Sequence, residues 1–112
     1  MNLANRLLMI AGLAAALTAH ADEATTAKGQ HVFGQWCSAC HGPGADKPGT
    51  TGLAAKYNGR LAAQLEQRTD LTPAMIKQYV RHGFAMMPPF RKTEIGEADL
   101  DALCVYLSNK KK

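Results

Sequence analysis

The chain has 112 residues with 13 basic and 9 acidic side chains, and its last three residues, 110–112, are all lysine. This length predicts one domain, and no basic stripe of the kind that binds nucleic acid runs through the rest of the chain. Three cysteines are too few for a disulfide-dense scaffold. A domain this small therefore needs another stabilising centre, such as a large apolar group to pack around.

The first 21 residues have the pattern of a secretory signal peptide. Residues 1–6 form a short, positively charged start, and nearly all of residues 7–17 are apolar. Ala19-His20-Ala21 then has the small-x-small pattern of a cleavage site. The apolar run is short for a membrane span, although an uncleaved membrane anchor is the alternative. We expect a cleaved leader at 1–21, export to the periplasm, and a mature domain at 22–112 with no membrane span after cleavage.

Helical patterns dominate the mature chain, and strand-like alternation is nearly absent. Thr25 or Thr26 can cap a first helix that runs to Trp36 and the cysteines. Val32 and Phe33 share a face with Trp36 at helical spacing. The sequence therefore predicts a first helix that starts at about residue 26 and buries this face.

The later elements follow from caps, glycines and prolines. Thr72 followed by Pro73 is a good helix start, and Gly83 can end that helix. Residues 85–90 are expected to be extended, because proline disfavours helical geometry in the residue before it. The other expected elements are a loop at 42–52, short helices at 53–57 and 60–68, a helix at Pro73–His82 and a last helix at Glu97–Ser108. The prediction is an all-α domain of four to five short helices.

The segment Cys37-Ser38-Ala39-Cys40-His41 carries the strongest chemical pattern in the chain. Two thiols at this spacing can each add across one vinyl group of haem, which fixes the porphyrin through two thioether bonds. The adjacent histidine is then placed to bind the iron from one face. Cys37, Cys40 and His41 are therefore the predicted attachment and ligand residues for one covalently bound haem c.

Three other uses of a Cys-x-x-Cys pair fit this sequence less well. A structural zinc site needs four ligands, and only Cys104 and scattered histidines could complete one. A thioredoxin-like redox pair belongs in a β-α-β pattern, and the sequence shows no such strands. A plain disulfide does not require the neighbouring histidine.

The opposite axial ligand is expected to be a soft side chain in a rigid downstream loop. Met86 and Met87 both qualify, and Met87 is favoured because the following Pro88 stiffens the backbone at that position. Met86 is then expected to fill space beside the haem. The remaining candidates, expected to have packing, capping or solvent roles, are Met75, His31 and His82. A His/Met pair fills both axial positions, which predicts single-electron transfer by a carrier rather than catalysis by an enzyme.

The surroundings of the haem can also be predicted. The loop at Pro48 and Gly49 could offer a backbone carbonyl to the second nitrogen of His41 and so fix the orientation of its ring. The apolar wall of the haem site is expected to include Leu53, Tyr57, Val80, Phe84, Pro89 and Phe90.

Four other residues have two possible interpretations each. Cys104 lies on the apolar face of the last helix and is expected to be a buried, inert thiol, with a disulfide between two copies as the alternative. Arg81, Arg91 and Lys92 could ring the haem edge and steer an acidic partner, or could be ordinary solvated surface.

Together these motifs resemble the class I cytochrome c family over nearly the whole mature chain. The matching motifs are Gly29-x-x-x-Phe33, Cys37-Ser38-Ala39-Cys40-His41, Met87-Pro88-x-Phe90 and Leu103-x-x-Tyr106-Leu107. The resemblance implies the class I cytochrome c fold, in which the first and last helices cross, Gly29 allows their close approach and Tyr106 packs on Phe33. It also implies that Met87 is the sixth ligand. Gly96 departs from the hydroxyl or acidic cap of relatives, so the first turn of the last helix is expected to fray.

Residues 76–92 are similar to the cytochrome subunits of flavocytochromes such as p-cresol methylhydroxylase and eugenol hydroxylase. In those proteins a flavoprotein oxidises a 4-alkylphenol, and the cytochrome accepts electrons from the reduced flavin one at a time. The similarity implies an FAD-dependent dehydrogenase as partner, although the insert at 42–70 is longer here. The alternatives are a free-standing soluble shuttle between respiratory complexes, and a haem sensor or peroxidase with an open iron site.

Overall fold

The structure, a computed structural model, describes residues 3–110, and it describes side chains from residue 19 onward. Within those limits the chain is helical, and an isolated bridge between Phe84 and Met87 is the sole β-type pairing. The elements are α1 (Leu3–Trp36), α2 (Ser38–His41), α3 (Pro48–Tyr57), the short 3₁₀ helix η1 (Leu65–Gln67), α4 (Pro73–His82) and α5 (Glu97–Ser108). The all-α prediction is confirmed.

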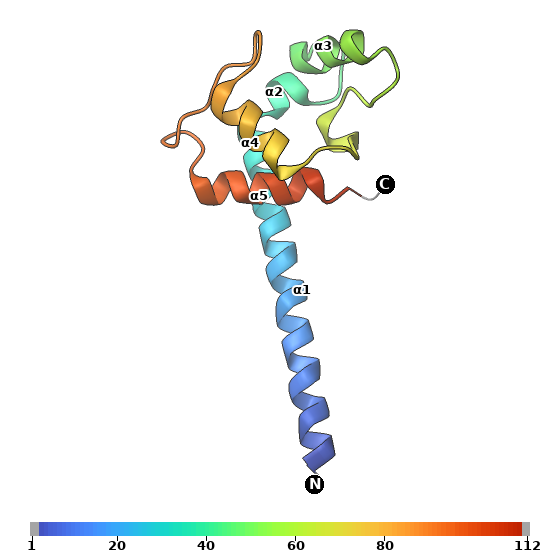
Figure 1. Cartoon of the computed structure of the whole chain (residues 1–112), viewed down its shortest axis with the longest axis vertical. Coiled ribbons are helices and arrows are strands. Elements are labelled where there is room, and N and C mark those ends of the chain that lie inside the picture. Colours follow the sequence, from blue (N-terminus) through green and yellow to red (C-terminus); the bar gives the residue numbers. More distant parts are fainter. Residues whose placement is uncertain (1–2, 111–112) are drawn as a thin grey trace.

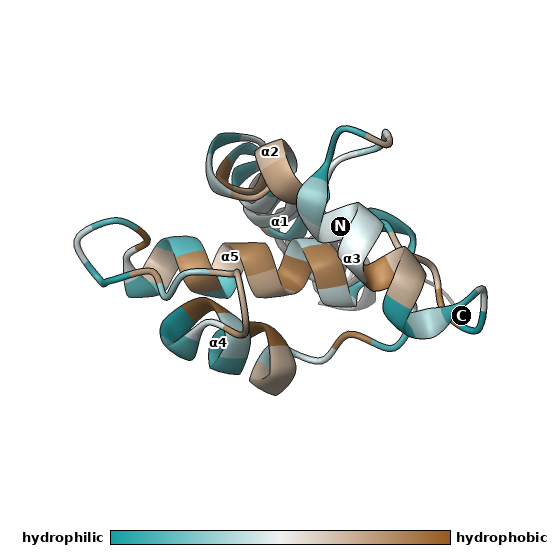
Figure 2. Cartoon of the chain, turned by 90° about the horizontal axis from the view of Figure 1, so that it is seen from above, coloured by the Kyte–Doolittle hydropathy of each residue, from teal (hydrophilic) through white to brown (hydrophobic). Residues whose placement is uncertain are grey.

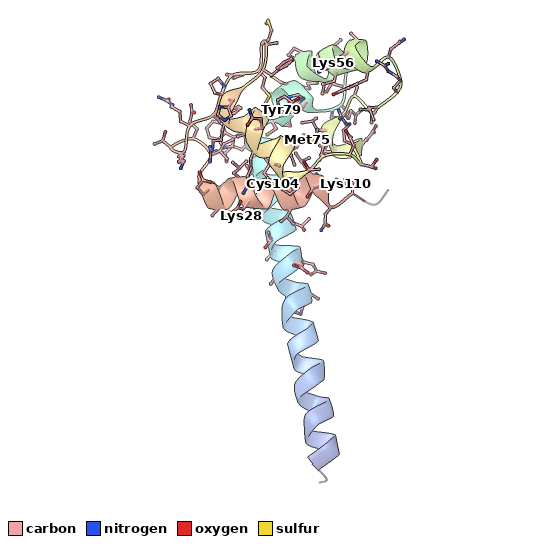
Figure 3. The ribbon with its side chains drawn as sticks, viewed as in Figure 1. Lys28, Lys56, Met75, Tyr79, Cys104 and Lys110 are labelled. Atoms are coloured by element: carbon pink, nitrogen blue, oxygen red, sulfur yellow. The ribbon has the colours of Figure 1, made fainter. Side chains whose placement is uncertain are left out.

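The crossing of α1 and α5 organises the molecule. Figure 1 shows α5 lying across the second half of α1, while the first half of α1 extends away from the other elements. A Cβ atom on Gly29 would lie 2.6 Å from Cβ of Tyr106 and would meet the carbonyl group of Ala102. The rings of Phe33 and Tyr106 pack with their centroids 6.0 Å apart, and Lys28 forms an ion pair at 3.0 Å to Asp99 beside the crossing (Figure 3). The crossing, the role of Gly29 and the Phe33–Tyr106 contact are confirmed.

The hydrophobic core fills the space between α1, α4 and α5. Figure 2 shows hydrophobic positions recurring along α4 and α5, which lie side by side. Ile95, from the segment between these two helices, is completely buried. The buried core residues are Val32, Phe33, Ile76, Val80, Ile95, Leu100, Leu103, Cys104, Tyr106 and Leu107. Cys104 is among them, so the predicted burial of this thiol on the apolar face of the last helix is confirmed.

The predicted start of the first helix at Thr25 or Thr26 is wrong. In the structure α1 is already helical at Leu3 and continues without a break to Trp36. The Thr25 hydroxyl donates to the Ala21 carbonyl at 2.9 Å, four residues earlier, instead of capping a helix end. The residues before Thr25 are rich in alanine and leucine, which favour helix, so a cap residue here does not interrupt it. No helix in the described part of the chain is sufficiently long and apolar for a membrane crossing.

Two predictions for the middle of the chain are also wrong. The loop expected at 42–52 stops at Lys47, because Pro48 occupies the first turn of α3, where its missing N–H costs nothing. The helix α3 then ends at Asn58, which adopts the left-handed conformation (φ 48°). A helix was expected at 60–68, but only η1 forms there; the rest of this segment is a loop that wraps the site described below.

The helix α4 begins and ends where the sequence predicted, but the segment after it differs in part from the prediction. Thr72 caps α4 by accepting a hydrogen bond from the Met75 N–H at 3.2 Å, and Gly83 ends the helix with φ 69°. Within 85–90, however, residues 85 and 86 form a tight turn, with Ala85 at φ 51°. Proline restricts only the residue immediately before it, which leaves these two residues free to turn.

The first turn of α5 begins directly at Glu97. Gly96 supplies no side-chain cap, but its carbonyl accepts the Leu100 N–H at 2.9 Å. The acidic side chain of Glu97 lies at the positive end of the helix, where it is favourable. The turn is therefore formed, and its fraying in solution stays a prediction.

Candidate functional site

A single cavity of about 580 Å³ brings the predicted functional residues together. Cys37, Cys40 and His41 line it from the end of α1 and from α2, and Met87 lines it from the segment after α4. The volume is within the usual range of about 300–1,000 Å³ for sites that hold a small molecule or cofactor. The two cysteines, the histidine and the methionine, which are up to fifty positions apart in the sequence, therefore line the same cavity.

The wall of this cavity is largely the one predicted. Leu53, Tyr57, Val80, Phe84 and Phe90 all line it. Pro89 does not, and Pro88 lines it instead, so this part of the prediction is wrong. Met87 and Pro88 line the cavity next to each other, and the chain returns to it at Phe90.

The imidazole of His41 is held in an apolar setting. Its Nδ1 atom is buried and has no hydrogen-bond partner among the described residues. Burial lowers the pKa of His41, which favours the neutral ring, and the neutral ring is the form that binds metals. The predicted carbonyl from Pro48 or Gly49 does not reach Nδ1, because these residues form the first turn of α3, where carbonyls bond along the helix. Gly49 still touches the ring: a Cβ atom there would lie 2.7 Å from Cε1 of His41.

The two methionines differ sharply in exposure. Met86 is at the tip of the tight turn and is 96% exposed, whereas Met87 is half-buried and packs against the hydrophobic core. Backbone hydrogen bonds join Phe84 and Met87 across the turn at 2.9 and 3.1 Å. The placement favours Met87 as the residue with a fixed sulfur. Met75 and Tyr79, labelled on α4 in Figure 3, also line the cavity, whereas His31 and His82 are exposed and lie outside it.

The family model described as cytochrome c oxidase, cbb3-type, subunit III matches residues 24–107. This chain belongs to that family. Searches of curated proteins and of solved structures found no match to the chain. Membership confirms the class I cytochrome c fold and a covalently bound haem c, and it establishes the chain as a haem electron carrier rather than a catalytic enzyme.

The residues of this cytochrome fit its cofactor. The apolar cavity suits a porphyrin, the neutral, partnerless imidazole of His41 suits iron, and both cysteines of the motif face the same space. Burial, together with the neighbouring Cys40, raises the pKa of the Cys37 thiol to about 12. Haem, when bound, supplies the redox chemistry, and the cysteine pair would serve attachment.

Arg68 is a cavity residue that the sequence analysis missed. It is only 4% exposed, and its guanidinium forms two hydrogen bonds to Asp70, at 2.5 and 2.6 Å. It also lies 4.7 Å from the centre of the Tyr57 ring. The hydrogen bond to Asp70 raises the pKa of Arg68, so the guanidinium stays charged and forms a partly buried ion pair at the cavity wall. The only sequence signal was an arginine two residues before an aspartate, which is common on surfaces.

The three cations expected near the haem edge do not behave alike. The side chains of Arg91 and Lys92 are 79% and 75% exposed. Arg81 is different, because its side chain is only 17% exposed and its guanidinium bonds to backbone carbonyls. The interpretation of Arg81 as ordinary solvated surface is therefore wrong, and its role in steering a partner stays a prediction.

Proposed function

We propose that this cytochrome carries single electrons in the periplasm with one haem, attached through Cys37 and Cys40 and ligated by His41 and Met87. The observation that supports this assignment is the meeting of all four side chains in one cavity. With His41 and Met87 as its two ligands from the protein, the iron would offer no site to oxygen or peroxide. Electrons would then enter and leave through the haem edge without a change of ligand.

We further propose an FAD-dependent, phenol-oxidising dehydrogenase as the electron donor. The support is the resemblance of residues 76–92 to the cytochrome subunits of such flavocytochromes. In the structure this segment presents Phe84 and Met86, 60% and 96% exposed, where it borders the cavity. An apolar tip in this position is available for contact with a second protein close to the cofactor.

A second candidate is a free-standing shuttle within a respiratory chain. The observation that favours a respiratory role is the family description, which names a subunit of a cbb3-type cytochrome c oxidase. In this case the electrons would come from a quinol-oxidising complex and pass to a terminal oxidase, with no stable flavoprotein partner.

Spectra of the holoprotein test the ligand assignment. We expect sharp reduced haem bands and, in the oxidised protein, the weak methionine-to-iron band at the red end of the spectrum. Met87→Ala should remove this band, whereas Met86→Ala, at the exposed tip, should leave it unchanged. The reverse pattern would assign the ligand to Met86. Binding of carbon monoxide to the native ferrous protein would instead support a sensor or peroxidase.

Reduction kinetics separate the two donors. The oxidised cytochrome is mixed with an FAD-dependent 4-alkylphenol dehydrogenase and its substrate, and in parallel with a quinol-oxidising complex and quinol. Fast substrate-dependent reduction by the flavoprotein alone supports the first proposal, and fast reduction by the quinol-oxidising complex alone supports the shuttle. Mass spectrometry of the exported protein completes the test: the proposed cleavage gives a mature chain that begins at Asp22 and carries one haem.

A further inference from the structure

We propose that Arg81 is a positioning residue for Met87: it closes the segment that carries the methionine and so determines how firmly the sulfur is held at the iron. This inference rests on the proposed function, because it takes Met87 as the axial ligand. It follows from the contacts of Arg81, which lies six residues before Met87, in the last turn of α4.

The segment between α4 and α5 has little regular structure of its own. It leaves α4 at Gly83, turns at residues 85 and 86, and returns toward the core at Phe90 and Ile95 before α5 begins. A tight turn and two prolines fix its local shape, but not its position over the cavity. That position depends on the contacts that join the segment to the two helices.

Arg81 supplies three of these contacts from one side chain. Its Nη1 atom donates to the Phe90 carbonyl at 3.2 Å and to the Ile95 carbonyl at 2.8 Å. Its Nη2 atom lies 3.1 Å from the Glu97 carboxylate, in the first turn of α5. One planar guanidinium therefore joins the end of α4, both ends of the returning chain and the start of α5. Lysine, with one ammonium group, cannot reproduce this arrangement.

Neighbouring contacts transmit this anchoring toward Met87. The Phe90 N–H donates to the Val80 carbonyl at 2.7 Å, so Phe90 is tied to α4 through both its backbone groups. Its ring also packs edge-on against Trp36, with the centroids 6.0 Å apart, at the wall of the cavity. Met87 is three residues from this fixed point and is bonded across the turn to Phe84. Loss of Arg81 would leave the Phe90 and Ile95 carbonyls without this donor and would loosen this end of the segment.

Competition with a small ligand measures how firmly Met87 is held. Imidazole added to the oxidised holoprotein binds iron only where the methionine has left, so the methionine-to-iron band disappears as imidazole binds. We expect Arg81→Met to lower the imidazole concentration for half-loss of the band about tenfold or more, because three charge-assisted hydrogen bonds are lost. Arg81→Lys should show a smaller shift in the same direction. The reduction potential should fall in the same order, since methionine ligation raises it.

The control is Arg91→Gln, which removes the same charge from the same segment. The Arg91 side chain is 79% exposed, and its polar contacts with the described residues are to the Glu94 carboxylate at 3.5 Å. The imidazole titration and potential of this variant should therefore match those of the wild type. If Arg81→Met does not accumulate, the Arg81→Lys titration decides the question. An unchanged imidazole midpoint and potential, with a lower melting temperature alone, would show a purely structural role and overturn the inference. A wild-type protein without the methionine band would overturn the Met87 assignment, and this inference with it.

Discussion

Replacing Gly29 with alanine tests the helix crossing that supports the whole domain. Alanine is favoured over glycine inside a helix by about 1 kcal/mol, so α1 alone would gain stability. At this position, however, the new Cβ would lie 2.6 Å from Cβ of Tyr106 and 2.7 Å from the carbonyl carbon of Ala102. These atoms belong to or adjoin the backbone of α5, so no rotamer change can relieve the contact and the helices must separate.

The expected magnitude follows from these two opposing effects. Overpacking of a well-packed contact costs about 1–3 kcal/mol, and a backbone obstacle favours the upper end of that range. After the helix-propensity gain, Gly29→Ala should be destabilised by about 2 kcal/mol. For a domain of this size that corresponds to a melting temperature about 8–16 °C lower.

Gly34→Ala is the matched control, because it makes the same change five residues later in the same helix. A Cβ atom there has no neighbour within 4 Å, so only the propensity gain applies. We expect this variant to be up to about 1 kcal/mol more stable than the wild type. Thermal and urea unfolding of the three holoproteins, followed by circular dichroism, gives the comparison. The close-approach explanation would be refuted if both variants became more stable together.

Three further predictions concern buried polar groups. The buried Thr50 hydroxyl donates to the Gly42 carbonyl at 2.7 Å, so Thr50→Val should cost about 1–3 kcal/mol in urea unfolding. Thr51→Val, at an exposed position, should change stability by less than about 0.5 kcal/mol. Burial raises the pKa of Cys104, so a thiol reagent should label no cysteine in the native holoprotein and one after unfolding. Burial, and then the hydrogen bond to Glu66, raise the pKa of Tyr106 from 10.0 to about 12. The folded state therefore retains this proton where the unfolded state loses it, and stability should fall between pH 10 and 12, less steeply in Tyr106→Phe.

Each of these measurements has a result that contradicts its reasoning. Equal destabilisation of the two threonine variants would show that burial of the hydroxyl is irrelevant. Three labelled thiols after unfolding would mean that neither Cys37 nor Cys40 is bonded to haem. An unchanged slope of stability against pH in Tyr106→Phe would remove Tyr106 as the group that titrates.

The sequence predicted best those features that depend on neighbouring residues. Thr72 and Pro73 define the start of α4 through a cap and a fixed φ, and Gly83 ends it through a positive φ. The haem attachment motif is equally local. Where two local signals conflicted, the prediction failed: Thr25 could cap a helix, but the alanine-rich residues before it continue the helix through that point.

The missed residues share a different property, because their environments are created by distant parts of the chain. Arg68 and Arg81 look like surface cations in the sequence, yet one is buried in the cavity wall and the other is largely covered by three elements. The pairing of Arg68 with Asp70, and of Arg81 with carbonyls nine and fourteen residues away, becomes visible only when the loops are placed. Pro88 and Pro89 could not be distinguished for the same reason, since the direction of the segment determines which one faces the cavity.

Contacts with distant parts of the chain also matter for the proposed function, because they hold the segment that carries Met87. If Met87 ligates the iron as proposed, fast electron transfer requires that the methionine stay in place when the charge of the iron changes. Helices fix the His41 side of the cavity, but the Met87 side is a turn followed by extended chain. The Phe84–Met87 turn fixes its local shape, but its position depends on tertiary contacts: the ring of Phe90 against Trp36 and the guanidinium of Arg81. The residues that hold the methionine should therefore affect the reduction potential and the exchange of the ligand without touching the iron.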